Sequence, residues 1–311
     1  MKTAEMLAAP VITENPQATT LLDLDLRSRL SAFVALTKPR IAFMVLVTVA
    51  IGFLLGTPGA VSIARLFWTL LGTGLVAGGA SAWNMILERD RDARMRRTSN
   101  RPLPSGRISL WEAVCFGSTI TIAGVVILFL GVNGLSSGVA ALTFVLYVGV
   151  YTPLKSVTTL NTAVGAIPGA LPPVIGWAAS TGRLGVEPWS LFLIMFLWQF
   201  PHFLAIAWIY REDYARGGHK MLPSVDPRGS MTGRQAVWHA FELLPAALIP
   251  AYVGLGGRWY FLGAFLLGLY YLYYAARFWL DVNDRSARQL LRASFLYLPL
   301  ILLLLLLDPS S

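Results

Sequence analysis

Charged residues are scarce in this chain. They make up 13% of its 311 residues, about half the share of a soluble domain, whereas hydrophobic residues make up 56%. A soluble protein of this length needs far more charge to cover its surface. Lipid is therefore the solvent for most of the chain, whose mean hydropathy is +0.61, and the composition predicts an integral membrane protein.

Cysteine is nearly absent, and no secretory signal is evident. The single cysteine, Cys115, excludes an internal disulfide and any Cys/His metal cluster. The first 30 or so residues lack the apolar core of a signal peptide, and their charged residues between 23 and 29 predict a solvated arm, which we assign to residues 1–36. The missing signal favours the bacterial plasma (inner) membrane as the location.

Long apolar runs recur along the rest of the chain, each able to cross roughly 30 Å of hydrocarbon as a helix. We therefore expect an all-α membrane protein with about nine transmembrane helices. The expected spans are 39–57, 66–88, 110–131, 137–153, 161–180, 188–210, 238–255, 259–278 and 291–307. They form one predicted domain, 37–308, with two long charged loops at 88–110 and 210–237.

The basic residues of the loops predict the orientation of these helices. If the N-terminus is cytoplasmic, the cytoplasmic segments hold 22 of the 25 Lys and Arg residues. The opposite loops hold only Arg65, Arg183 and Arg258. The bias predicts a cytoplasmic N-terminus and an external C-terminus.

Three oxygen-bearing side chains follow one another at the end of the second span. Asn84, Glu88 and Asp92 are four residues apart, which places them on one face of a helix. Oxygen ligands at a membrane edge favour a hard cation, and Mg²⁺ prefers one or two carboxylates together with waters and phosphate oxygens. The pattern predicts a site for a magnesium-bound diphosphate.

Several arginines surround these acids. Arg94, Arg97 and Arg101 could each bind phosphate oxygens bidentately. Arginine-rich cytoplasmic loops are also ordinary topology signals that bind anionic lipid head groups, and acids among them can form weak surface ion pairs. Neither a topology signal nor surface ion pairs require Glu88 and Asp92 to be spaced as on one helix face, so the diphosphate site remains the favoured interpretation.

The segment from Asn84 to Gly106, NMILERDRDARMRRTSNRPLPSG, resembles the first signature of the UbiA superfamily of intramembrane prenyltransferases. That signature has an acid where this chain has Met85, and an aspartate where it has Glu88. The resemblance covers nearly the whole chain and implies the UbiA-type helical bundle. It also implies a second acidic motif after the sixth span, with Mg²⁺ and the diphosphate held between the two motifs.

The second charged segment reads YREDYARGGHKMLP, residues 210–223. Tyr210 and Tyr214 stand where the resemblance implies acids, which leaves Glu212 and Asp213 as the implied metal ligands. Arg211 and Lys220 are further candidates for substrate binding. The alternative is a juxtamembrane loop whose charges compensate one another.

One residue and three segments together resemble the branch of the superfamily that transfers a farnesyl group to haem b. They are Met85, LTKPRI (36–41), WQFPHF (198–203) and REDYARGGHKMLP (211–223). This resemblance implies farnesyl diphosphate and haem b as substrates and haem O as product. An aromatic or quinone-precursor acceptor is the alternative within the superfamily. A transporter is a rival of another class, although its charged groups would be expected near mid-membrane. No nucleic-acid partner is expected.

Three further residues are candidates for contact with the substrates. Lys155 ends the fourth span and could face the leaving diphosphate, with Tyr151 offering a hydroxyl or an aromatic face; a snorkelling lysine beside an interfacial tyrosine is the alternative. His202 could ligate haem iron, orient the porphyrin or carry a proton. It could instead bond a carbonyl freed by Pro201.

Overall fold

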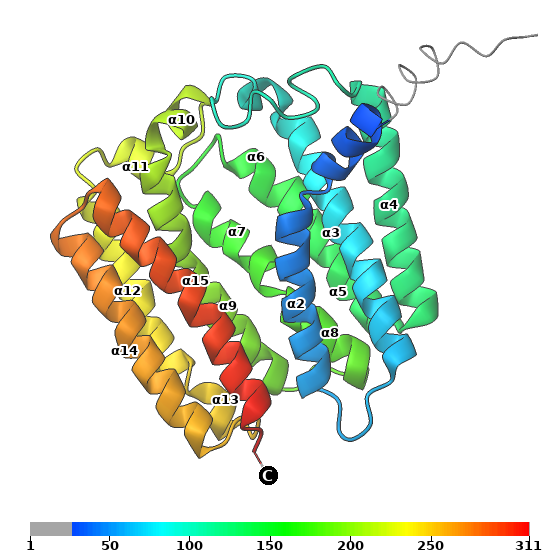
Figure 1. Cartoon of the computed structure of the whole chain (residues 1–311), viewed down its shortest axis with the longest axis vertical. Helices are drawn as coiled ribbons and strands as arrows, with labels where there is room; N and C mark the ends of the chain where they lie inside the picture. Colours follow the sequence, from blue (N-terminus) through cyan, green and yellow to red (C-terminus); the bar gives the residue numbers. More distant parts are fainter. Residues whose placement is uncertain (1–26, 311) are drawn as a thin grey trace, which may run out of the picture.

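The computed structural model describes residues 27–310 as a bundle of helices (Figure 1). A short helix, Arg27–Leu36, precedes the others. These are α2 Pro39–Leu55, α3 Ile63–Asp92, α4 Leu110–Gly131, α5 Gly134–Phe144, the π-helix η1 Val145–Tyr151, α6 Thr152–Leu154, α7 Asn161–Ala170, α8 Pro172–Thr181, α9 Glu187–Ile209, α10 Arg211–Arg216, α11 Leu222–Val225, α12 Ser230–Ala246, α13 Ile249–Tyr252, α14 Arg258–Leu280 and α15 Asp284–Leu307. Residues 27–310 contain no strand.

The helices confirm an all-α membrane bundle. Among the described residues, seven helices or helix groups are long and apolar enough to cross a membrane, and the bent pair of Arg27–Leu36 and α2 makes up to eight. The remaining expected span, 238–255, corresponds to α12 and α13, which pack against α9 and α14. Neither helix alone is long enough to cross a membrane, because α12 ends after 17 residues and α13 has only 4.

Two expected spans are each built from more than one helix. The span expected at 137–153 comprises α5, the π-helix η1 and α6, and π-helical turns inside helices are frequent at functional sites. The span expected at 161–180 is divided between α7 and α8 at Leu171. Pro172 and Pro173, which lack the N–H groups needed to continue α7, begin α8.

Close helix packing in the N-terminal half depends on glycine. A Cβ on Gly79 of α3 would lie 2.0 Å from Thr121 Oγ1 of α4, and one on Gly176 of α8 would lie 1.9 Å from the Val49 carbonyl of α2. Small residues allow membrane helices to approach this closely. The C-terminal half instead packs around buried aromatic rings, such as Tyr271 and Tyr297, whose centroids are 5.1 Å apart.

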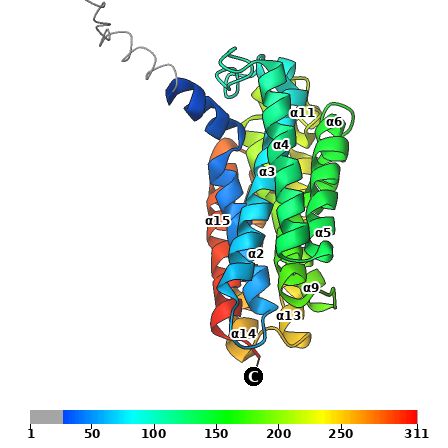
Figure 2. The ribbon, with the colours of Figure 1, turned by 90° about the vertical axis from the view of Figure 1, so that its right-hand side faces the viewer.

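The charged loops gather at one end of the bundle. Figure 1 shows α6, α10, α11 and the loop after α3 at this end, with the C-terminus at the other. The edge-on view in Figure 2 shows helix Arg27–Leu36 leaning away from the bundle. Its residues Ala32 and Leu36 are nevertheless fully buried, in a cluster with Met85. Of the predicted solvated arm 1–36, residues 1–26 lie outside the described residues.

Candidate functional site

The last three turns of α3 carry the predicted row of oxygen ligands. Asn84, Glu88 and Asp92 are 1%, 4% and 0% exposed. Ionisable groups are rarely buried to this extent unless cations or hydrogen-bond donors compensate them. The neighbours of the three side chains therefore define the site.

Lys155 compensates Glu88. Its Nζ lies 2.9 Å from Glu88 Oε1 and 4.5 Å from the centroid of the Tyr151 ring. Tyr151 is the last residue of η1 and Lys155 directly follows α6. This end of the fourth span lies beside α3. Gly165 of α7 makes room for the Tyr151 ring, since a Cβ there would lie 2.4 Å from it. The structure thus brings the predicted residues Tyr151 and Lys155 together with Glu88.

Arg101 compensates one side of Asp92. Its Nη1 donates to Asp92 Oδ2 at 2.6 Å, while the hydroxyl of Thr98 donates to the backbone carbonyl of Asp92 at 2.9 Å. The other carboxylate oxygen, Asp92 Oδ1, is buried and has no hydrogen-bond partner among residues 27–310. This oxygen can accept a further cation or donor.

Lys38 reaches the row from the first span. Its Nζ donates to Asn84 Oδ1 at 2.8 Å, and Asn84 Nδ2 donates to Thr152 Oγ1 at 3.2 Å. Lys38 adopts a left-handed backbone conformation, with φ of 49°, which is uncommon for a residue with a side chain. The bend between helix Arg27–Leu36 and α2 therefore directs a lysine at the site, a contact that the sequence alone does not reveal.

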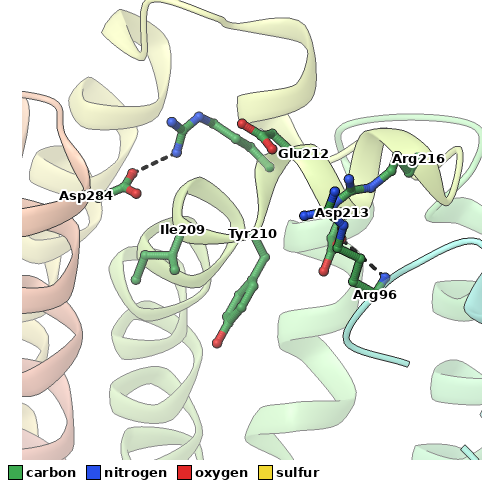
Figure 3. Close-up of a pocket in the computed structure, with 8 residues that line it drawn as sticks. Arg96, Ile209, Tyr210, Glu212, Asp213, Arg216 and Asp284 are labelled. Atoms are coloured by element: carbon green, nitrogen blue, oxygen red, sulfur yellow. Dashed lines mark hydrogen bonds and ion pairs between the residues drawn. The ribbon is translucent and has the colours of Figure 1, made fainter. Parts of the chain in front are cut away.

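Asp213 joins the second charged segment to the first. It accepts hydrogen bonds from the backbone N–H of Arg96, at 3.3 Å, and from the guanidinium of Arg216, as Figure 3 shows. Burial alone would raise the pKa of Asp213, but the hydrogen bonds from Arg216 and Arg96 lower it below its ordinary value. Asp213 is thus an anion that ties α10 to the loop after α3.

The neighbours of Asp213 in the sequence point elsewhere. Glu212 is exposed and its side chain is directed away from Asp213 (Figure 3). Arg211 donates to Asp284 of α15 at 2.8 Å rather than turning toward Glu88. A pocket of about 290 Å³ lies between these groups, lined by Arg96, Ile209, Tyr210, Arg211, Glu212, Asp213, Arg216 and Asp284.

Two tyrosines occupy the positions where the resemblance implies acids. Arg97 lies 4.9 Å above the ring of Tyr210 and 5.5 Å above that of Tyr214, and it donates to the Tyr214 hydroxyl at 3.3 Å. The tyrosines therefore hold Arg97, the predicted phosphate ligand, by cation–π contacts. Arg94 and Lys220 are exposed.

His219 is buried at the site, although its position in a charged loop suggests exposure to water. The left-handed turn at Gly218, with φ of +71°, precedes it, and the next residue, Lys220, donates its backbone N–H to the Lys155 carbonyl at 2.7 Å. Burial lowers the pKa of His219 to about 4, and the negative charge of Glu88 raises this pKa only in part. Its ring is therefore neutral near pH 7, and its buried Nδ1 has no hydrogen-bond partner in the part of the chain that the structure describes. The Gly217–Gly218 pair is the signal that could have indicated this inward turn.

His202 lies on α9 and its side chain faces α15. Its Nδ1 is 2.7 Å from the Ser294 hydroxyl of α15, and its ring stacks on Trp198 with centroids 4.7 Å apart. The partner is a hydroxyl rather than a carbonyl freed by Pro201. A role for His202 in binding substrate stays a prediction.

The oxygen atoms at this site fit a hard divalent cation whose remaining ligands come from a diphosphate. Within residues 27–310, no group of three or more His, Cys, Asp or Glu side chains is placed to hold a metal ion by itself. Mg²⁺ commonly takes only one or two carboxylates and completes its shell with phosphates and water. The unpartnered, buried Asp92 Oδ1 is a ligand of the required chemistry.

Known proteins resemble this chain over most of its length. Residues 45–298 match the model of the UbiA prenyltransferase family. A protoheme IX farnesyltransferase of Solibacter usitatus is 50% identical over 89% of this chain and 98% of its own. Another, of Koribacter versatilis, is 43% identical over 90% of this chain and 94% of its own.

Solved structures share the fold at low sequence identity. A digeranylgeranylglyceryl phosphate synthase superimposes with a TM-score of 0.76 at 18% identity, covering 90% of this chain and 98% of its own. A UbiA homologue of Archaeoglobus fulgidus, bound to GPP and Mg²⁺, superimposes with a TM-score of 0.61 at 16% identity, covering 88% and 99%. These structures show the fold, whereas the match to the family model and the 50% identity to the Solibacter relative show that the chain belongs to the UbiA prenyltransferase family.

Proposed function

We propose that this protein transfers the farnesyl group of farnesyl diphosphate to a vinyl group of haem b, with addition of water, to give haem O. The observation that carries the proposal is the buried row of Asn84, Glu88 and Asp92, met by Lys38, Lys155 and Arg101. The names of the Solibacter and Koribacter relatives support haem b as the acceptor. We further propose that residues 37–308 form a single prenyltransferase domain.

The donor diphosphate would bind at the charged end of the bundle. Asn84, Glu88 and Asp92 would hold Mg²⁺, and Asp213 would complete the set from the second segment; the exposed Glu212, directed away from Asp213, would contribute least. The homologue bound to GPP and Mg²⁺ supports this assignment. When bound, the metal would stabilise the negative charge that develops on the departing diphosphate.

The basic residues would bind the leaving group. Lys155 is held between Glu88 and the ring of Tyr151, so its charge is already placed where the diphosphate would sit, with little reorganisation needed. Arg101 occupies one oxygen of Asp92 and would remain available to phosphate through its other N–H groups. Arg94, Arg97, Arg211 and Lys220 are further candidates, of which Arg211 would first have to leave Asp284.

The transfer itself requires a dry chamber. The bond between the farnesyl carbon and the diphosphate oxygen breaks, and the vinyl group of haem b attacks that carbon to form the new carbon–carbon bond. Water then adds to the resulting porphyrin-side cation and releases a proton, so that farnesyl diphosphate, haem b and water give haem O and diphosphate. The membrane interior would exclude other water from the allylic cation.

We also propose that the charged end faces the cytoplasm of a bacterium, with the C-terminus outside the plasma membrane. The bias of Lys and Arg and the placement of the charged loops opposite the C-terminus (Figure 1) support this orientation. Labelling of single engineered cysteines in intact cells would test it.

The decisive experiment incubates the purified protein with haem b, farnesyl diphosphate and Mg²⁺ and measures the mass of the porphyrin. We expect a gain of one farnesyl unit plus water. Replacing haem b by an aromatic acceptor tests the alternative substrate class, and prenylation of that acceptor alone would contradict the proposal. We expect His202→Ala to weaken haem binding while leaving farnesyl diphosphate binding intact; a normal haem titration would limit His202 to its bond with Ser294.

A further inference from the structure

Two aromatic side chains of α9 are held by a single residue of α15. Trp198 and His202 lie one turn apart on α9, and Ser294 faces both of them. The indole N–H of Trp198 donates to the Ser294 carbonyl at 3.0 Å, and His202 Nδ1 lies 2.7 Å from the Ser294 hydroxyl oxygen. All three residues are buried. Buried polar atoms are nearly always hydrogen-bonded, so the donors and acceptors of this cluster must match.

The single proton of the Ser294 hydroxyl is already committed. The hydroxyl donates to the Leu291 carbonyl at 2.6 Å, a bond that serine commonly forms with the preceding turn of its helix. Donation to His202 instead would leave two oxygens facing each other at 2.6 Å with no proton between them. Ser294 Oγ therefore accepts from Nδ1–H of His202. A neutral imidazole carries one ring proton, so the lone pair of this ring is on Nε2.

The Nε2 side of His202 lies close to the membrane-facing surface. The rings of Phe203 and Phe295 meet the imidazole edge to face, with centroids 5.4 Å and 5.3 Å away, and Phe295 is 60% exposed. Nε2 forms no hydrogen bond within residues 27–310. An unsatisfied lone pair is unfavourable in such apolar surroundings. A ligand that accepts an electron pair would remove this cost.

We propose that Ser294 is a positioning residue for the haem substrate. By accepting from Nδ1–H, it keeps the Nε2 lone pair of His202 available to ligate the haem iron, while Ser294 itself does not touch the haem. Histidines that bind metals usually donate their other ring N–H to a fixed acceptor, which sets the tautomer and raises the basicity of the ligating nitrogen. Imidazole is a common axial ligand of haem iron. The inference rests on the proposed function, in which haem b is the acceptor.

Nitrogen-15 NMR of the full chain in phosphatidylcholine vesicles, labelled at histidine, tests the tautomer without haem. The chain has three histidines, and the His202→Gln variant identifies the His202 signals. We expect a protonated Nδ1 and a bare Nε2, as in His239, whose Nδ1 lies 2.7 Å from the Gln235 carbonyl. We expect Ser294→Ala to populate the Nε2–H tautomer of His202. A protonated Nε2 in the unsubstituted protein, or an unchanged tautomer in Ser294→Ala, would overturn the proposal.

Titration with haem b and with iron-free protoporphyrin IX distinguishes positioning from packing. We expect Ser294→Ala to weaken haem b binding about 10-fold, at the lower end of the loss caused by removing the partner of a metal ligand. Binding of protoporphyrin IX should not change, because it offers no iron to Nε2. Ser294→Thr retains a hydroxyl and should bind haem b normally. Tyr297→Phe is the matched control, since it removes from the same helix a buried hydroxyl that has no partner among the described residues.

The outcomes separate this inference from the proposed function. Equal losses for the two porphyrins in Ser294→Ala would show a packing role and overturn the inference, as would unchanged binding of haem b. If haem b binding depends on Ser294 as expected but the enzyme prenylates only an aromatic acceptor, the proposed function fails and the role of Ser294 in ligation stands.

Discussion

The two acidic segments lie at the same end of the bundle, yet their side chains are placed very differently. Glu88 and Asp92 are buried on α3 and contact Lys155 and Arg101, whereas Glu212 is exposed. Asp213 is the only acid of the second segment that turns inward among the described residues, and it binds the backbone of the first loop. The acids of the first segment are therefore buried beside cations, whereas the second segment is tied to the first through Asp213.

The sharpest test of this difference compares adjacent acids on α3. We expect Glu88→Gln or Asp92→Asn to lower prenyl transfer by about 100- to 1,000-fold, because each removes a preorganised group from the diphosphate site. Asp90→Asn is the matched control: the Asp90 side chain is 84% exposed, and we expect nearly full activity. Turnover is measured as the rate of porphyrin mass gain. Full activity in the Glu88 and Asp92 variants would remove the metal-site proposal.

Two substitutions of Lys155 distinguish a role in binding the diphosphate from a role in folding. Lys155→Met leaves Glu88 buried without its cation, and we expect turnover to fall by about 10- to 100-fold while KM for haem b changes little. Lys155→Arg keeps the charge and is expected to recover part of the activity. Equal losses in both variants, accompanied by a fall in Tm, would indicate a structural role alone.

His219 extends the comparison, since it belongs to the second segment but is buried near Glu88. Its Nδ1 has no partner within the described residues, so we expect it to hydrogen-bond the bound diphosphate. His219→Leu should raise KM for farnesyl diphosphate by about 5- to 30-fold, the effect of losing one hydrogen bond in a dry site, with KM for haem b unchanged. His219→Gln serves as the hydrogen-bonding control. An equal rise in both KM values would point to a collapsed loop.

The smallest effects should separate Asp213 from Glu212. We expect Asp213→Asn to lower turnover by about 3- to 10-fold, because the charge-assisted hydrogen bonds to the Arg96 backbone and Arg216 weaken. Glu212→Gln should change turnover by less than about two-fold, as is usual for an exposed acid. The magnesium dependence of the rate is measured in both variants. A larger loss in Glu212→Gln would reverse the assignment of the inward-facing acid.

Much of the fold could be predicted from the sequence because lipid imposes a simple rule. An apolar run of sufficient length must form a helix that satisfies its own backbone groups, so the spans follow from hydropathy. The spacing of Asn84, Glu88 and Asp92 likewise placed them on one face, because the period of a helix does not depend on its surroundings. The η1 π-helix was not predicted, since an apolar run does not show how its turns are divided, whereas Pro172 and Pro173 mark the break between α7 and α8 in the sequence itself.

Contacts between distant segments were decided only by the tertiary structure. Lys38 immediately precedes the first span and donates a hydrogen bond to Asn84. The identical charge of the surrounding arginines gives no indication of which one reaches Asp92. The outward turn of Glu212 and the inward turn of His219 depend on how α10 and its glycine turn dock on the loop after α3. The local pattern of residues determines which elements form and which faces are polar, whereas pairing across the bundle depends on packing between segments far apart in the chain.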